Sequence, residues 1–162
     1  HTAGKQGEEL VSGIRSAFDL IASGQVSASA AQAREFGILS ATDGISMHRM
    51  RLLADAKQKA LLMSDNYLPL TAAVRQLPGK EMVAGLSAEI ESRIESGVMT
   101  QHDGVIARQM SLVLCGGDGE PGAVSEQQLL DLELEVFLRL LAEPASQARM
   151  EHMLKTGKPL RN

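Results

Sequence analysis

Aromatic residues are scarce in this sequence: tryptophan is absent, and aromatic side chains make up 2% of 162 residues. A β-sandwich core draws on aromatic and β-branched residues, whereas alanine, leucine and methionine are strong helix formers. The hydrophobic residues, 44% of the total, are mostly aliphatic and sulfur-containing. The composition therefore favours packed helices. The length allows one domain or two small helical lobes with a sizeable core.

Cysteine is limited to Cys115, which excludes an internal disulfide and a cysteine-based metal cluster. The four histidines do not show the close spacing of a zinc site, so no metal ligands are predicted. No apolar run approaches the roughly 20 residues that cross a bilayer, and no secretory signal pattern is present. These absences predict a cytoplasmic protein without a membrane span.

Clustered positive charge is also lacking. The formal net charge is −4, and the basic residues are scattered along the chain. Nucleic-acid-binding proteins usually carry a basic patch or stripe. The charge pattern therefore argues against nucleic acid as a partner.

Helical periodicity and helix-capping residues recur along the chain. Side chains able to cap a helix N-terminus stand at Ser29, Ser46, Thr100 and Ser125. No segment alternates apolar and polar residues convincingly enough to predict a strand. We therefore predict an all-α fold of six or seven helices, which cover residues 8–23, 29–37, 46–65, 79–95, 100–115, 125–141 and 144–157.

Breaks in the pattern suggest a division of the chain. Residues 1–7 are small and polar, and are interpreted as a tag remnant or a disordered start. The stretch from Pro69 to Gly79 contains the best candidate boundary. This predicts N-terminal helices at 8–66 and a C-terminal helical domain at 67–162.

The loop Gly117–Gly122, with sequence GDGEPG, formally matches the dinucleotide-binding fingerprint. The true motif follows a strand, whereas this loop follows a predicted helix. Asp118 and Glu120 would also repel a pyrophosphate. We interpret the loop as a helix C-cap and connection. Cys115 precedes it at a helix C-terminus, where the helix dipole disfavours a thiolate, and no catalytic residue is predicted.

Glu133 falls among apolar residues in a helical projection of residues 125–141. A buried carboxylate is costly unless it is paired and hydrogen-bonded. We therefore predict a structural ion pair between Glu133 and an arginine or histidine of another helix, with Arg108 or Arg149 favoured. His102 also falls on an apolar helix side, and is interpreted as a hydrogen-bonded core residue.

Lys57 lies on the apolar side of the helix predicted at 46–65. One interpretation is a lysine whose stem covers apolar surface while its ammonium reaches water. The other is a phosphate contact at an edge of the protein. The pattern leaves both open.

Two stretches resemble known enzyme families. Residues 18–62 contain Ala30, Ala33, Gly37, Ile38 and Leu39 in the pattern A-x-x-A-x-x-x-G-[LI]-[LV], which resembles the tail of a crotonase (enoyl-CoA hydratase) domain. Residues 115–162, with the ending MLKTGKPLRN, are similar to the C-terminus of large bacterial 3-hydroxyacyl-CoA dehydrogenases that carry a hydratase-like module.

The resemblance implies a parent enzyme of fatty-acid β-oxidation that uses NAD and CoA thioesters. Its catalytic groups would lie upstream, so this segment would bind no cofactor except through a CoA contact at Lys57 and Lys59. Terminal crotonase helices pack between subunits, which implies homo-oligomers and packing against upstream domains of the same polypeptide.

Two functions follow from these observations. The first is a non-catalytic C-terminal portion of such an enzyme, which serves packing and oligomerisation. The alternative is a free-standing helical protein-interaction domain. The first predicts a large exposed apolar patch, which we expect on the helix that carries Leu10, Ile14, Phe18 and Ile21.

Overall fold

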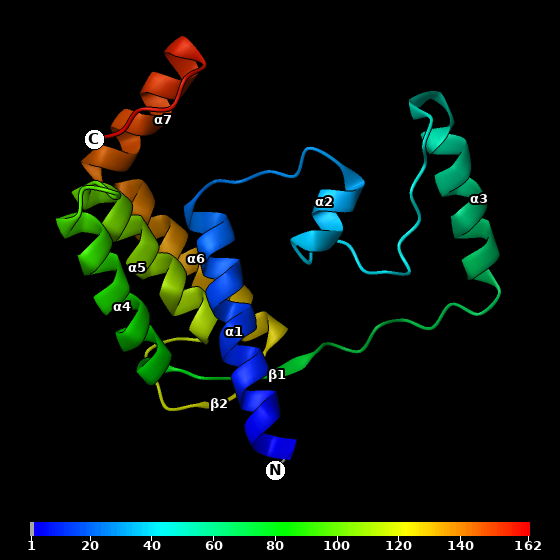
Figure 1. The fold of residues 1–162 in the computed structure, drawn as a ribbon, viewed down its shortest axis with the longest axis horizontal. Helices are drawn as coiled ribbons and strands as arrows, with labels where there is room; N and C mark the ends of the chain where they lie inside the picture. The colour runs from blue at the N-terminus through cyan, green and yellow to red at the C-terminus, as the bar shows by residue number, and fades with distance from the viewer. Residues whose placement is uncertain (1) are drawn as a thin grey trace. The chain divides into compact units, whose positions relative to one another are not determined.

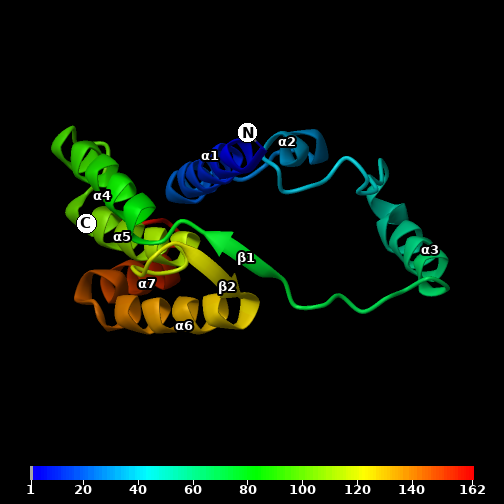
Figure 2. The ribbon, with the colours of Figure 1, turned by 90° about the horizontal axis from the view of Figure 1, so that it is seen from below.

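The computed structural model describes residues 2–162, with side chains from residue 7 onward, and confirms a mostly helical fold (Figures 1 and 2). His1, within the predicted tag remnant or disordered start, lies outside the described residues. The elements of this described part are α1 (Thr2–Ala22), α2 (Ala30–Glu35), the 3-10 turn η1 (Arg49–Arg51), α3 (Leu52–Ser64), β1 (Val74–Leu77), α4 (Lys80–Glu95), α5 (Gln101–Cys115), β2 (Gly122–Ser125), α6 (Glu126–Ala142) and α7 (Pro144–Thr156).

Three of the four predicted caps are confirmed. The hydroxyl of Ser29 accepts a hydrogen bond from the Gln32 amide, which satisfies one of the free N–H groups at the start of α2. Thr100 and Ser125 form reciprocal capping boxes with the residues three positions later.

The prediction at Ser46 is wrong. The chain enters η1 after His48 and α3 only at Leu52, so Ser46 precedes the helix by several residues. Its hydroxyl donates to the Asp55 carboxylate in α3. The Ser46 hydroxyl therefore binds a side chain one turn inside the helix and not the first amides of the helix. Residue type alone does not distinguish these two arrangements.

The prediction that the chain contains no strand is also wrong. Strands β1 and β2 form an antiparallel pair, with Val74 opposite Ser125 and Leu77 opposite Gly122. Each strand has four residues, too few for a reliable alternation pattern. The pair nevertheless matters for the fold, because it holds the segment before α4 against the segment before α6.

Contacts divide the chain differently from the predicted ranges 8–66 and 67–162. The main unit joins the residues up to 23 with residues 72–162, and the middle unit comprises residues 24–71. Helix α1 therefore belongs with the C-terminal helices. Within the main unit, α4 and α5 run side by side, and α5 also packs against α1 and α6 (Figure 1).

The core of the main unit draws on α1, α4 and α5. Phe18, Leu86 and Ile90 are fully buried, and Ile14 is 7% exposed. The guanidinium of Arg93 lies 5.7 Å from the centre of the Phe18 ring, which places a cation over an aromatic face. The expectation that α1 carries the exposed apolar patch is therefore wrong, because this face of α1 is part of the core.

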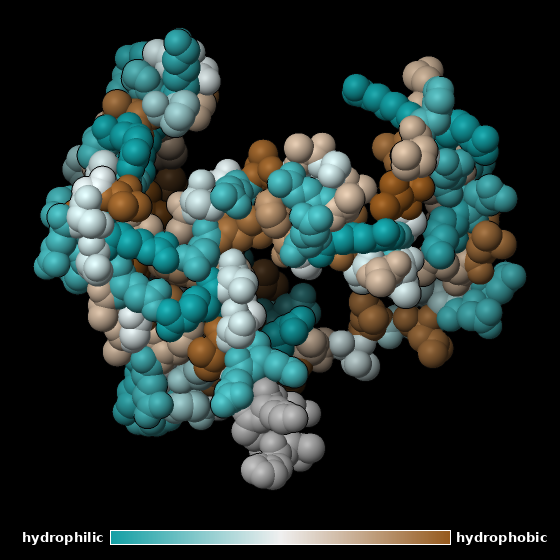
Figure 3. Space-filling view, in the orientation of Figure 1, coloured by the Kyte–Doolittle hydropathy of each residue, from teal (hydrophilic) through white to brown (hydrophobic). Residues whose placement is uncertain are grey.

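The middle unit buries very little. Within residues 24–71, all of which are described, Ala33 is the one buried residue. Most of its large apolar side chains are exposed, and Figure 3 shows hydrophobic side chains at the surface of α3. These include Val26, Met47, Met50, Leu53, Leu62, Leu68 and Leu70.

None of the helices described in residues 2–162 has both the length and the apolar character needed to span a membrane.

Candidate functional site

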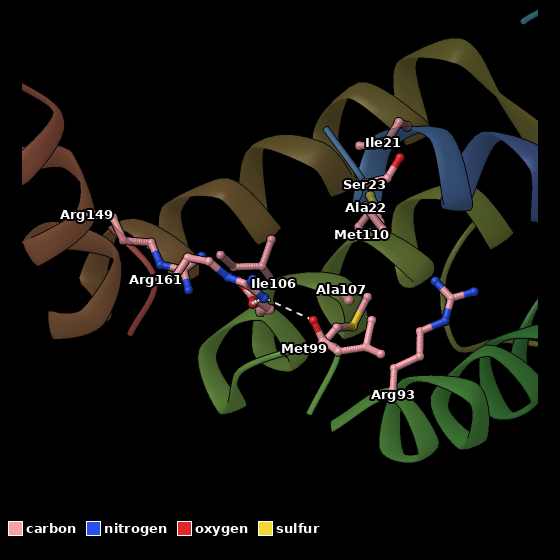
Figure 4. Close-up of a pocket in the computed structure, with 12 residues that line it drawn as sticks. Ile21, Ala22, Ser23, Arg93, Met99, Ile106, Ala107, Met110, Arg149 and Arg161 are labelled. Atoms are coloured by element: carbon pink, nitrogen blue, oxygen red, sulfur yellow. Dashed lines mark hydrogen bonds and ion pairs between the residues drawn. The ribbon is translucent and has the colours of Figure 1, made fainter. Parts of the chain in front are cut away.

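A cavity of about 540 Å³ lies in the main unit, where the ends of α1 and α4 meet the first turns of α5. Its apolar lining includes Ile21, Met99, Ile106 and Met110. Its charged lining comes from α4, α5, α7 and the C-terminal segment (Figure 4). The charged residues are Arg93, Asp103, Arg149 and Arg161.

Asp103 is positioned by the capping box of α5. The Thr100 hydroxyl accepts from the Asp103 amide at 3.1 Å, and the Asp103 carboxylate accepts from the Thr100 amide at 2.9 Å. The second carboxylate oxygen lies 2.8 Å from the Arg149 guanidinium. The same side chain therefore closes the start of α5 and binds α7.

Arg149 also fastens the C-terminal segment. Its Nε donates to the side-chain oxygen of Asn162 at 2.7 Å, and its Nη2 donates to the Asn162 main-chain oxygen at 3.3 Å and to the Thr100 hydroxyl at 3.2 Å. The Asn162 amide in turn donates to the Ala145 carbonyl at 3.1 Å. These bonds engage most of the donors of the Arg149 fork.

Two opposing effects act on the carboxyl of Asp103. Partial burial raises its pKa, because a charge loses solvation. Hydrogen bonds from the Thr100 backbone and from Arg149, together with the Thr100 hydroxyl and the Arg149 charge, outweigh that effect and lower the pKa to about 2. Asp103 is therefore a stable anion at neutral pH and is not suited to accept a proton as a general base.

Replacement of Asp103 by asparagine is expected to lower the free energy of unfolding by about 2 kcal/mol at pH 7, because one pKa unit corresponds to about 1.4 kcal/mol. The folded-state pKa of about 2 is below the ordinary value of 3.8. The contribution of the Asp103 carboxylate to the free energy of unfolding is therefore fully present above pH 3.8. It is lost as the pH falls from 3.8 toward 2. Urea unfolding of both proteins across this range measures it.

The matched control for Asp103 is Glu135→Gln. Glu135 pairs with Arg139 on the exposed surface of α6, with both side chains 58% exposed. Such pairs contribute less than about 0.5 kcal/mol, so this variant should unfold almost as the parent does. A loss for Asp103→Asn that stays constant down to pH 2 would show that the carboxylate charge is not its cause.

The predicted ion pair of Glu133 is corrected by the structure. Glu133 is exposed, Arg108 pairs with Glu91 of α4, and Arg149 pairs with Asp103. On α6 the buried side is centred on Val136, and Phe137, on the other side of Glu133, is 54% exposed. In the helical projection, the buried face and an exposed apolar face are adjacent and look like one broad apolar face. Glu133 lies between the two.

The lining of the cavity does not include the remaining predicted site residues. Lys57 and Lys59 are exposed on α3 in the middle unit. His102 is 7% exposed, and its Nε2 lies 3.0 Å from the Ser146 hydroxyl, as expected of a hydrogen-bonded core histidine. In the described residues, no three His, Cys, Asp or Glu side chains are grouped to hold a metal ion.

The GDGEPG loop has the predicted character of a helix C-cap and connection. Gly116 ends α5 with a left-handed backbone, φ +81°, and the loop leads into β2. Glu120 of the loop pairs with Lys80 at the start of α4. Burial raises the pKa of the neighbouring Cys115 thiol to about 11, which keeps it protonated and a poor nucleophile at neutral pH.

In the sequence, Asp103 stands out only as an acid in the first turn of the helix predicted at 100–115. The Thr100-x-x-Asp103 spacing was the available signal for a capping box. Nothing local relates it to Arg149 and Arg161, which follow 46 and 58 positions later. The cavity and its charged lining are therefore products of helix packing.

Comparison with known proteins relates the chain to part of one enzyme. No family model and no solved structure matches it. It is 41% identical over 160 residues to a probable 3-hydroxyacyl-CoA dehydrogenase of Bacillus subtilis (strain 168). That match covers 98% of this chain but only 20% of the relative, so the chain spans about a fifth of the relative's length. The predicted resemblance to a 3-hydroxyacyl-CoA dehydrogenase is confirmed to this extent.

Proposed function

We propose that this chain is a non-catalytic helical portion of a fatty-acid β-oxidation enzyme, in which it packs against upstream domains and supports oligomerisation. The enzyme would be a cytoplasmic, NAD-dependent 3-hydroxyacyl-CoA dehydrogenase with a crotonase-like hydratase module. The observation that carries the proposal is the 41% identity over one fifth of a probable enzyme of this activity.

The exposed apolar surface of the middle unit supports a packing role. Leu53, Leu62 and Leu68 are 82%, 71% and 81% exposed. Each fully buried leucine contributes roughly 1.5–3 kcal/mol, so leaving many of them in water is unfavourable. A segment with one buried residue also has no core of its own. Burial against a further protein surface would recover this energy.

Helix α6 offers a second surface of the same kind in the main unit. Its outer face carries Leu130, Leu134, Phe137 and Leu138, each between 52% and 57% exposed. These positions recur at the spacing of one helix face. Apolar patches of this kind mark interfaces more often than isolated exposed leucines do.

Catalysis and most ligand binding would belong to the upstream part of the enzyme. For this segment we keep the prediction of a CoA contact at Lys57, with Lys59, whose exposed ammonium groups are compatible with a phosphate partner. Weaker CoA binding in a Lys57→Ala variant of the whole enzyme would support it; unchanged binding would remove it.

Amide hydrogen exchange tests the packing role. The matched fifth of the Bacillus subtilis relative is replaced by this chain, and exchange in α3 is compared with that of the isolated chain. We expect the α3 amides to exchange much more slowly in the chimera, because burial closes them to solvent. The isolated chain should not oxidise a 3-hydroxyacyl-CoA with NAD, whereas the chimera should.

Two variants of the chimera sharpen this test. Leu53→Glu places a charge on the exposed apolar surface of α3 and should abolish the protection, while Gln58→Glu on the same helix should preserve it. Equal exchange in the chimera and in the isolated chain would contradict the packing role. It would favour the free-standing helical interaction domain instead.

A further inference from the structure

The cavity of the main unit concentrates positive charge in an acidic chain. Three guanidinium groups, from Arg93, Arg149 and Arg161, line it together with one carboxylate, Asp103. The chain as a whole has a formal net charge of −4. A local excess of cations beside an apolar lining is the combination that recognises an anion with an apolar body.

The three guanidinium groups differ in how many donors remain free. Arg93 binds the Asp19 carboxylate at 2.5 Å, and Arg149 is engaged by Asp103, Thr100 and Asn162. Arg161 makes one hydrogen bond within the described residues, to the Val98 carbonyl at 3.0 Å. Its distance to the Asp103 carboxylate is 3.6 Å, which is too long for a hydrogen bond.

Arg161 is therefore the cation best placed to receive a new anion. A guanidinium has five N–H donors, and most of those of Arg161 have no acceptor in the described residues. Its side chain is 67% exposed, so a ligand can reach it from solvent. A carboxylate would bind such a fork in two parallel hydrogen bonds.

The rest of the cavity suits an alkyl group. Met99, Ile106 and Met110 line it beside the guanidinium end, and Figure 4 shows Arg149 and Arg161 together at one side. Methionine side chains are flexible and adapt to the shape of an apolar ligand. The volume, about 540 Å³, is within the usual range of small-molecule sites.

We propose that this cavity binds a small amphipathic organic anion, an unbranched alkyl carboxylate. The carboxylate would pair with Arg161, and the alkyl chain would lie along Met99, Ile106 and Met110. An inorganic anion would leave the apolar lining in water, and a neutral alkyl compound would leave the guanidinium donors unused. This site does not depend on the proposed packing role.

Titration of the 162-residue chain with matched probes tests the site. Octanoate is compared with octanol, octylamine and acetate at constant ionic strength, with carbon-13-labelled methionine methyl groups observed by NMR. We expect octanoate to shift the Met99 and Met110 signals and to bind at least about tenfold more tightly than the other three, the ratio expected for one charge-assisted pair.

The variant Arg161→Gln should weaken octanoate binding at least about tenfold and leave octanol binding unchanged. Arg139→Gln, on the exposed surface of α6, is the control and should bind octanoate as the parent does. The chemical shifts of residues away from the cavity show whether the Arg161→Gln variant is folded. The shifts of the Met99 and Met110 methyl groups in the parent protein test the site without any variant.

Four results would overturn the proposal. Octanol could bind as tightly as octanoate, which would show that the carboxylate does not contribute to binding. Acetate could do the same, which would show that the alkyl chain does not contribute. N-acetylleucine could bind more tightly, which would point to a peptide C-terminus in place of an alkyl chain. Octanoate could instead shift Met50 and Met63 of the middle unit, which would indicate general adsorption to exposed apolar surface.

Discussion

Replacement of Phe18 by alanine is expected to lower the free energy of unfolding by about 3–5 kcal/mol, which is a large share of the stability of a small domain. Phe18 is fully buried and contacts the core that α4 and α5 form with α1. The substitution removes its ring, leaves a cavity, and takes away the aromatic face beneath the Arg93 guanidinium. Urea unfolding followed by circular dichroism measures the loss.

Val11→Ala on the same helix is the matched control for Phe18. Val11 is 37% exposed, so its truncation should cost less than about 1 kcal/mol. Hydrogen exchange adds a regional readout: loss of Phe18 should accelerate exchange in α4 and α5 as well as in α1. Equal small effects of the two substitutions would mean that α1 does not belong to the core of the main unit.

Replacement of Gly79 by alanine is expected to cost more than about 3 kcal/mol. Gly79 has φ +59° and ψ −146°, a conformation essentially restricted to glycine. A Cβ at this position would lie against the main chain of Gly119 and 3.0 Å from the carbonyl carbon of Glu120. Backbone atoms cannot turn aside as a side-chain end can, so the loop and the start of α4 would have to separate.

The consequence of that separation can be measured. The Gly79 amide donates to the Cys115 carbonyl at 3.0 Å, and the Lys80 amide donates to the Gly119 carbonyl at 2.8 Å. The first bond ties the start of α4 to the end of α5, and the second ties it to the loop that follows α5; both should be lost in Gly79→Ala. Thermal unfolding of the variant gives the size of the effect, and amide exchange at these two positions gives its location.

A glycine inside α4 provides a control of opposite sign. Gly85 lies within α4, is exposed, and has nothing within 4 Å of a Cβ built on it. Gly85→Ala should therefore raise the free energy of unfolding by about 0.5–1 kcal/mol, through helix propensity alone. Destabilisation by both substitutions would indicate that α4 tolerates no added methyl group, and that the strained backbone is not the cause.

The helices and most of their ends were predictable because their causes are local. A cap such as Thr100 and its partner Asp103 are three residues apart, so residue type and spacing identify them together. Glycine at a helix end is equally local, as Gly116 and Gly157 show. Ser46 is the exception: α3 begins only at Leu52, and the Ser46 hydroxyl donates to the Asp55 carboxylate in place of capping the first turn.

Burial was less predictable because it depends on which faces meet. Glu133 lies at the border of two apolar faces of α6, and the sequence contains no mark of which face contacts α5. Helix α1 posed the same problem. Its apolar face predicts a packing partner, but that partner could equally be another domain or the α4–α5 pair. The core position of Phe18 follows from the second arrangement.

By itself, the sequence determined the helical class, the caps at Ser29, Thr100 and Ser125, the helix C-cap and connection at Gly117–Gly122, and the resemblance to a 3-hydroxyacyl-CoA dehydrogenase. Each depends on composition or on residues near one another in the chain. Only the tertiary structure decided the β1–β2 pair, the place of α1 and the cavity at Asp103, Arg149 and Arg161. Those features join residues more than 40 positions apart. Their energies arise from contacts that exist only after the helices have packed.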